Sequence, residues 1–289
     1  MRLPNRLRVF LNGGTGNQLF QISAARLYAQ NHSVKLAFDP SWTAVTRHRS
    51  NLDTISFLSL KENEKILPRR PFALSAAELV ASERILGNKW LLDKNFRFRG
   101  HNNDIQALIS VSGVRALAGV FADPSVHHEL ALSNAQISVN WPSSIGQTLP
   151  QSYATIHVRG GDYFQLGGAF GVLSKEYFKK ALDLIPDNIP HYWVTNDVEY
   201  ATEVSNAFPE RANSVFGPEE MSTFETLKIL SESKYLVASN STLSWWGNAL
   251  SRNNQTAIGP SSYSPQSTSN WMITDSWVTV EACWHEIRK

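Results

Sequence analysis

Short apolar runs alternate with stretches of helical periodicity at the start of this chain. The run Leu7–Leu11 predicts a buried strand, and residues 12–17 form a glycine-rich turn. Apolar residues then recur at helical spacing over 20–27, and apolar and polar residues alternate over 34–38 as in a second strand. This order of strand, turn, helix and strand favours parallel strands joined by a right-handed crossover. The sequence therefore predicts an α/β fold.

The same alternation returns in the second half of the chain. Strands and helices are expected to follow one another there at 153–159, 178–185, 191–195, 197–208, 224–230 and 235–238. Between the halves, Asn140–Pro150 is rich in turn-forming residues and lacks periodicity, as a linker does. We therefore predict an N-terminal domain over 1–145 and a C-terminal domain over 150–289. Within 43–140 only 75–86 and 104–111 show helical patterning.

The composition is that of a globular protein in solution. The 289 residues are 42% hydrophobic and 18% charged, enough for two domains of about 140 residues or one large α/β domain. A formal net charge of +2 gives no overall attraction to nucleic acid, so we expect no such partner and look for local anion sites. Cys283 is the only cysteine, which excludes an intramolecular disulfide and a cysteine-based zinc site.

The N-terminal residues carry no sign of targeting. They lead into the predicted strand Leu7–Leu11 without an apolar segment long enough for a signal peptide or a membrane span. We therefore expect a cytoplasmic protein.

Three predicted strands of the C-terminal half end in polar residues. The first ends at His157 and Arg159 before Gly160–Gly161, the second is followed by Asn196–Asp197, and the third by Ser239–Thr242. Ligands of open α/β sheets bind at the carboxyl edge of the strands, so we expect these groups to converge on one crevice. A planar guanidinium beside exposed backbone N–H groups of a glycine turn suits a phosphate or diphosphate.

Each of these features also has an ordinary structural explanation. Asp162 has the spacing of a simple ion-pair partner for Arg159, and Ser239–Thr242 has the composition of a helix N-cap. The same helix start would nevertheless direct N–H groups and a dipole toward a phosphate. Trp245 and Trp246 are expected to serve packing rather than sugar stacking.

The glycine turn near the N-terminus permits a different hypothesis. Gly14 and Gly16 after a strand, with Asp39 closing the next one, resemble half of a dinucleotide-binding fingerprint, but Leu19 stands where its third glycine belongs. An NAD(P)-dependent enzyme acting on a nucleotide sugar is thus one alternative, and a sugar-binding module without chemistry is another. The sequence lacks a P-loop, which disfavours an ordinary NTPase, and it lacks a nucleophile elbow. It also lacks the Asp-x-Asp pair on which metal-dependent nucleotide-sugar enzymes hold their ion, so no metal is expected.

Four segments together resemble the alpha-1,2-fucosyltransferases of glycosyltransferase family eleven. They are residues 13–21 (GGTGNQLFQ), 157–163 (HVRGGDY), 195–197 (TND) and 239–247 (SNSTLSWWG). Their order and spacing agree with the family over nearly the whole chain. The resemblance implies two Rossmann-like domains facing a cleft, a GT-B-like fold. It also implies a GDP-fucose donor, a galactose 2-hydroxyl of a glycan as acceptor, inversion, and neither metal nor cofactor.

The resemblance also assigns roles to residues. Arg159 would neutralise the departing β-phosphate, and Asp162 would orient Arg159, so these two form the catalytic pair. The expected donor-binding residues are His157 and Asp197 at the guanosine, Ser241, Thr242 and Ser244 along the phosphates, and Gly16, Asn17 and Gln18 across the cleft.

One departure from the family pattern bears on the donor. Gly160 stands where the motif has a second arginine, so another GDP-deoxyhexose such as colitose is an alternative donor. The general base, the acceptor glycan and the oligomeric state stay open. Peripheral association with the inner membrane, where a lipid-linked glycan would be the acceptor, is a further hypothesis.

Overall fold

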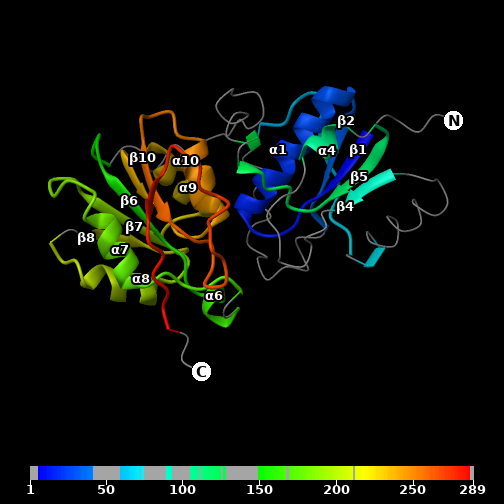
Figure 1. Cartoon of the computed structure of the whole chain (residues 1–289). Helices are drawn as coiled ribbons and strands as arrows, with labels where there is room; N and C mark the ends of the chain where they lie inside the picture. The colour runs from blue at the N-terminus through cyan, green and yellow to red at the C-terminus, as the bar shows by residue number, and fades with distance from the viewer. Residues whose placement is uncertain are drawn as a thin grey trace. The chain divides into compact units, whose positions relative to one another are not determined.

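Two parallel sheets organise the chain, one in each of two compact units, Met1–Asn140 and Trp141–Lys289 (Figure 1). The structure is a computed structural model. It describes residues 6–41, 59–71, 73–74, 89–92, 105–110, 112–124, 126–127, 149–166, 169–210 and 212–286. The expected helical region 75–86 lies outside the described residues, and so does the expected linker apart from 149–150.

In the N-terminal unit, the described strands form a five-stranded sheet in the order β3-β2-β1-β5-β4. The elements in chain order are β1 (Arg6–Phe10), α1 (Thr15–His32), β2 (Lys35–Asp39), β3 (Glu64–Ile66), β4 (Lys89–Leu92), α4 (Ile105–Ser110) and β5 (Val114–Ala118). Every neighbouring pair of strands is parallel. The predicted strand, helix and strand at the start of the chain are confirmed as β1, α1 and β2, and the expected helix near 104–111 is α4.

The C-terminal unit has, among its described residues, a six-stranded sheet in the order β11-β10-β9-β6-β7-β8. The strands are β6 (Ala154–Val158), β7 (His191–Thr195), β8 (Ala212–Phe216), β9 (Tyr235–Val237), β10 (Thr256–Pro260) and β11 (Val278–Val280). The helices are α6 (Asp162–Gln165), α7 (Lys175–Leu182), α8 (Val198–Asn206), α9 (Thr223–Glu232) and α10 (Thr242–Ala249). All neighbouring strands in this sheet are parallel as well.

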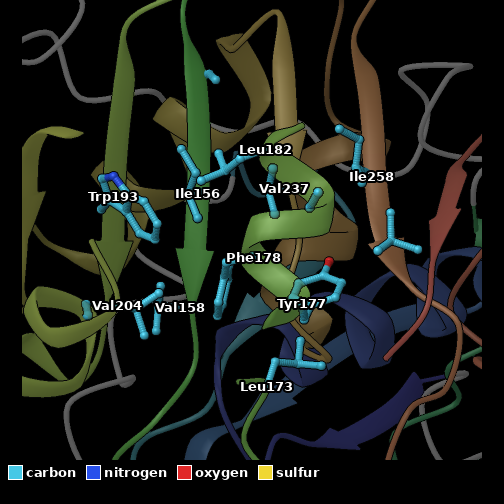
Figure 2. Packing of buried hydrophobic residues seen from close by; sticks show 14 of the residues in the cluster. Ile156, Val158, Leu173, Tyr177, Phe178, Leu182, Trp193, Val204, Val237 and Ile258 are labelled. Atoms are coloured by element: carbon cyan, nitrogen blue, oxygen red, sulfur yellow. The ribbon is translucent and has the colours of Figure 1, made fainter. Parts of the chain in front are cut away.

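Alternate residues of the central strand β6 face different layers. Ile156 belongs to the apolar cluster under α7, where Figure 2 shows Phe178 and Leu182 lying against the strands. On the other face, Thr155 donates to the carbonyl of Ile229 in α9. Because alternate side chains of β6 point to opposite faces of the sheet, some contact the helices that cover one face and the others contact the helices that cover the other.

The sheet order determines where the polar strand ends lie. β9, β6 and β7 are neighbours in the middle of the sheet and run in the same direction. Their carboxyl ends therefore lie side by side. The expectation that these three ends converge is confirmed.

Candidate functional site

Arg159 is the first residue after β6 and is held by its close neighbours. Its Nη2 donates to both carboxylate oxygens of Asp162, at 2.7 and 3.0 Å, and its guanidinium lies 4.7 Å above the ring centre of Tyr163. Burial raises the pKa of Tyr163, so the ring stays neutral beside this charge. The expected ion pair of Arg159 and Asp162 is thus confirmed, and it is made through Nη2 of the guanidinium.

The Arg159 guanidinium also carries a donor that the ion pair does not use. Its Nε is buried and has no hydrogen-bond partner among the described residues. The side chain as a whole keeps 19% of its surface exposed. A buried N–H without an acceptor is costly, so this atom fits a ligand that brings an oxygen.

The glycine turn after Arg159 is closed by two side chains that follow β7. The backbone N–H of Gly160 donates to Oδ1 of Asn196 at 3.1 Å, and that of Gly161 donates to Oδ2 of Asp197 at 2.7 Å. The expectation that this turn offers exposed N–H groups to a phosphate is wrong. The groups are present, but the neighbouring strand end supplies their acceptors.

The space beside Gly160 is filled by Asp197. A Cβ at position 160 would lie 2.7 Å from Oδ2 and 2.9 Å from Cβ of Asp197. The same carboxylate accepts through Oδ1 from the backbone N–H of Tyr200, at 3.1 Å, and so caps α8. An arginine at position 160 could enter only if Asp197 moved.

The floor of the site is a buried polar cluster between β6, β9 and α10. Nδ1 of His157 lies 2.5 Å from Oγ of Ser244 and 3.3 Å from Oγ of Ser239. Burial, and to a smaller extent the positive charge of Arg159, lowers the pKa of His157 to about 3. His157 is therefore neutral at physiological pH, and its Nδ1 is used to fix the start of α10.

Helix α10 begins at the carboxyl end of β9. Oγ of Ser241 accepts from the backbone N–H of Leu243 at 3.3 Å, which confirms the N-cap, and Thr242 is the first helical residue. A helix start carries N–H groups and a partial positive charge that favour an anion in front of it. Trp245 and Trp246 are fully buried, as expected of packing residues.

Asn240 is a residue of this region for which sequence reasoning gave no role. Its Nδ2 donates to the carbonyl oxygens of Phe170, at 2.8 Å, and Tyr263, at 3.0 Å, while its Oδ1 is buried without a hydrogen-bond partner among the described residues. Asn240 thus ties two loops to the end of β9. The only signal in the sequence was an amide inside the serine-rich strand end.

In the N-terminal unit, the glycine turn after β1 is contacted by side chains from the first turn of α1. Nε2 of Gln18 donates to the carbonyl of Gly13 at 2.9 Å, and Asn17 packs so closely that a Cβ on Gly13 would lie 2.8 Å from its Nδ2. Gly13 has a φ of +73°, which favours glycine. Gly16 is buried in the first turn of α1. These contacts stabilise the turn itself.

Asp39 does not have the surroundings that dinucleotide binding requires. It is fully buried and accepts from Nε of Arg8 at 2.8 Å and from the backbone N–H of Ser41 at 2.9 Å. Burial raises its pKa, but the hydrogen bonds from Ser41 and the charge of Arg8 outweigh that effect and leave the pKa below its ordinary value. An acid engaged in this way is not available to a ribose, which counts against the NAD(P) hypothesis.

Two kinds of feature are absent from the part of the chain that the structure describes. Within that part, no cluster of three His, Cys, Asp or Glu side chains could hold a metal ion. No helix there is both long and apolar enough to span a bilayer.

Comparison with known proteins gives a family and two curated relatives. Residues 125–281 match the model of glycosyl transferase family 11. The O-antigen biosynthesis glycosyltransferase WbnK of Escherichia coli is 24% identical over 305 residues, covering 93% of this chain and 99% of that protein. An alpha-1,2-colitosyltransferase of Escherichia coli is 21% identical over 251 residues, covering 82% of this chain and 84% of that protein.

Solved structures with a similar fold include two fucosyltransferases. NodZ alpha-1,6-fucosyltransferase co-crystallized with GDP matches with a TM-score of 0.52 and 15% identity, covering 86% of this chain and 93% of that chain. A variant of FUT1 from Arabidopsis thaliana in complex with GDP matches with a TM-score of 0.53 and 12% identity, covering 88% and 70%. At these identities the likeness concerns the fold, and the predicted α/β fold of GT-B type is confirmed.

Proposed function

The chain belongs to glycosyltransferase family 11, and we propose that it transfers L-fucose from GDP-fucose to the 2-hydroxyl of a galactose in a glycan. The transfer would invert the anomeric centre and need no metal. The observation that carries this proposal is Arg159, which follows the central one of three neighbouring strands with polar ends and whose buried Nε lacks an acceptor among the described residues. A sugar diphosphate would supply that acceptor.

The reaction we propose is a single displacement. The galactose hydroxyl oxygen forms a bond to the anomeric carbon and passes its proton to a general base, to which no residue is assigned. The bond from that carbon to the diphosphate breaks at the same time, and the bonding pair leaves with GDP. Negative charge therefore grows on the diphosphate in the transition state, where a fixed cation is worth more than in the ground state. Arg159 is the group we assign to that charge, and its loss should cost about 3 kcal/mol of transition-state stabilisation.

Asp162 acts through Arg159 in this scheme. Because Nη2 of Arg159 donates to both oxygens of this carboxylate, Asp162 holds that end of the guanidinium in place. The remaining N–H groups of Arg159 are then preorganised for phosphate oxygens. We therefore keep Arg159 as the catalytic residue and treat Asp162 as the residue that orients it.

The start of α10 is the second part of the proposed phosphate site. Ser241 and Thr242 stand at the helix N-terminus, whose dipole and N–H groups suit the second phosphate. His157 and Ser244 hold this helix start in place from below. The proposed contacts of His157 and Asp197 with guanosine, and those of Gly16, Asn17 and Gln18 with the donor, rest on the family resemblance.

The named relatives bear on the donor and the acceptor. Two structures of similar fold contain GDP, which supports a GDP-sugar donor. The relative named for O-antigen biosynthesis supports a glycan acceptor, for which we propose reaction in the cytoplasm with peripheral association at the inner membrane. The relative named as a colitosyltransferase favours one second candidate, transfer of colitose from its GDP-sugar, and Gly160 in place of an arginine is consistent with it.

A donor screen tests the proposed function. The purified protein is incubated with a β-galactoside and, in separate reactions, GDP-fucose, GDP-colitose, GDP-mannose or UDP-galactose, and the products are identified by mass spectrometry and linkage analysis. We expect a deoxyhexose on the galactose 2-hydroxyl and release of GDP, with and without EDTA. Transfer only from a UDP-sugar would contradict the proposal, as would NAD(P)H turnover without any glycoside product. Preference for GDP-colitose would select the second candidate.

A further inference from the structure

Asn196, which the proposed mechanism does not use, contacts the turn that follows Arg159 and the first residue of α6. It follows β7, and its Oδ1 accepts from the backbone N–H of Gly160 at 3.1 Å. Its Nδ2 lies 3.4 Å from the carbonyl oxygen of Gly160 and 3.4 Å from Oδ1 of Asp162. One amide group therefore uses both its acceptor and its donor on the segment that carries Arg159.

The turn fits this amide closely. Gly161 has a φ of +57°, a conformation that favours glycine, and a Cβ there would lie 2.8 Å from Nδ2 of Asn196. The absence of a side chain at position 161 is therefore what lets the amide approach the backbone. A tight fit of this kind leaves the turn few alternative positions once Asn196 is in place.

A chain of contacts leads from Asn196 to the guanidinium. Oδ1 of Asp162 faces Nδ2 of Asn196 and also accepts from Nη2 of Arg159 at 2.7 Å. The amide and the guanidinium thus share one carboxylate oxygen. Any movement of the amide changes the position of that oxygen and, with it, the direction of Arg159.

We propose that Asn196 is a positioning residue for transfer, which fixes Arg159 through Asp162 and the glycine turn. This inference rests on the proposed role of Arg159 at the diphosphate. A misplacement of about 1 Å at a catalytic group can cost about 100-fold in rate. Asn196 therefore contributes to the rate without touching the donor.

An amide suits this position better than an acid. In Asn196→Asp the new carboxylate can still accept from Gly160 N–H, so the turn keeps its main hydrogen bond. It cannot donate to Asp162, and it places a second negative charge 3.4 Å from that carboxylate. The substitution therefore keeps the hydrogen bond that closes the glycine turn but removes the contact that positions Asp162 and, through it, Arg159.

The test compares kcat, the KM for the GDP-sugar and the melting temperature of four proteins. These are the wild type, Asn196→Asp, Asn196→Ala and the control Asn253→Ala, which removes an exposed amide that donates to the carbonyl of Glu232 in the same unit. We expect kcat to fall about 10- to 100-fold in both Asn196 variants and to stay at the wild-type value in the control. The melting temperatures of Asn196→Asp and the control should be similar.

A double variant supplies the signature that a merely structural role would not give. In Asp162→Asn/Asn196→Asp the amide and the carboxylate have exchanged places, so the like-charge contact is gone. With Asp162→Asn measured alone as a further protein, we expect kcat of the double variant to exceed the value predicted from the two single effects by about 10-fold, as coupled neighbours do. Independent effects in the double variant would overturn the inference. So would a kcat of Asn196→Asp equal to that of an active wild type.

The activity of the wild type distinguishes a failure of this inference from a failure of the proposed function. If the wild type shows no transfer from any GDP-sugar, the proposed function fails, and the role of Asn196 fails with it. If the wild type is active and Asn196→Asp does not fold, Asn196→Ala gives the kcat comparison. Unchanged kcat in that variant would then contradict the inference alone.

Discussion

Gly160→Ala is the substitution whose effect the structure fixes most closely. The added methyl would lie 2.7 Å from Oδ2 and 2.9 Å from Cβ of Asp197, which is closer than atoms in contact can approach. Asp197 must therefore move. Its movement threatens two hydrogen bonds at once, one from Gly161 N–H at 2.7 Å and one from Tyr200 N–H at 3.1 Å.

The cost can be worked out from those two bonds. A hydrogen bond to a charged group contributes about 1.5–3 kcal/mol, and loss of an N-cap costs about 0.5–2 kcal/mol. If the carboxylate turns away from Gly161 and keeps the cap on α8, only the first contribution is lost. We therefore expect Gly160→Ala to lower the free energy of unfolding of the C-terminal unit by about 2–3 kcal/mol.

Urea unfolding followed by tryptophan fluorescence measures this cost, because all tryptophans except Trp42 and Trp90 belong to the C-terminal unit. The substitution is made in three backgrounds, wild type, Asp197→Asn and Asp197→Ala. Asparagine keeps the size that causes the clash, so a cost should persist there, although a smaller one because its hydrogen bonds are no longer made to a charged group. It should fall below about 1 kcal/mol in Asp197→Ala, where the obstructing atoms are gone. An equal cost in all three backgrounds would refute the steric argument.

The other predictions concern the reaction and the acid stability. Arg159→Ala should lower kcat about 100-fold or more with little change in melting temperature, and a variant that keeps its rate would contradict the assigned role. EDTA should leave transfer unchanged, and loss of activity that Mn²⁺ restores would contradict a metal-free reaction. Burial and Arg159 lower the pKa of His157 to about 3. An unfolded histidine takes up a proton near pH 6.5, so its contribution to stability is lost as pH falls from about 6.5 toward 3, by up to about 1.4 kcal/mol per pH unit. His157→Gln should therefore flatten the pH dependence of unfolding between pH 6 and 4, and an unchanged slope would count against the neutral histidine.

The three central strands of the C-terminal sheet were predictable from local sequence. Each is a short apolar run that ends abruptly in polar residues, a pattern typical of strands buried on both faces. For β7 the expected bounds and the observed ones agree, His191–Thr195. The convergence of their ends then followed from the general rule for parallel sheets.

Other strands carry too little local signal to be found. β3 and β11 have three residues each and stand at the edges of their sheets, where exposed positions remove the apolar pattern. β10 contains Gly259 and Pro260, which ordinarily mark a turn. Such strands form because a neighbouring strand offers a partner, and that partner is distant in the sequence.

In the candidate site, too, contacts between residues close in sequence were predictable and contacts between distant residues were not. The pairing of Arg159 with Asp162 is local, so the spacing of three residues predicted it. The closure of the glycine turn joins residues 36 positions apart, and the sequence did not indicate that Asn196 and Asp197 would take both N–H groups. The sequence thus predicted which groups would meet, while the fold determined which hydrogen bonds are already satisfied.

The most direct test of the account is a crystal structure of the protein with GDP. The account predicts that the diphosphate oxygens lie within hydrogen-bond distance of the Arg159 guanidinium, Nε included, and in front of Thr242 at the start of α10. A diphosphate bound away from Arg159, with Nε still lacking an acceptor, would contradict the central claim.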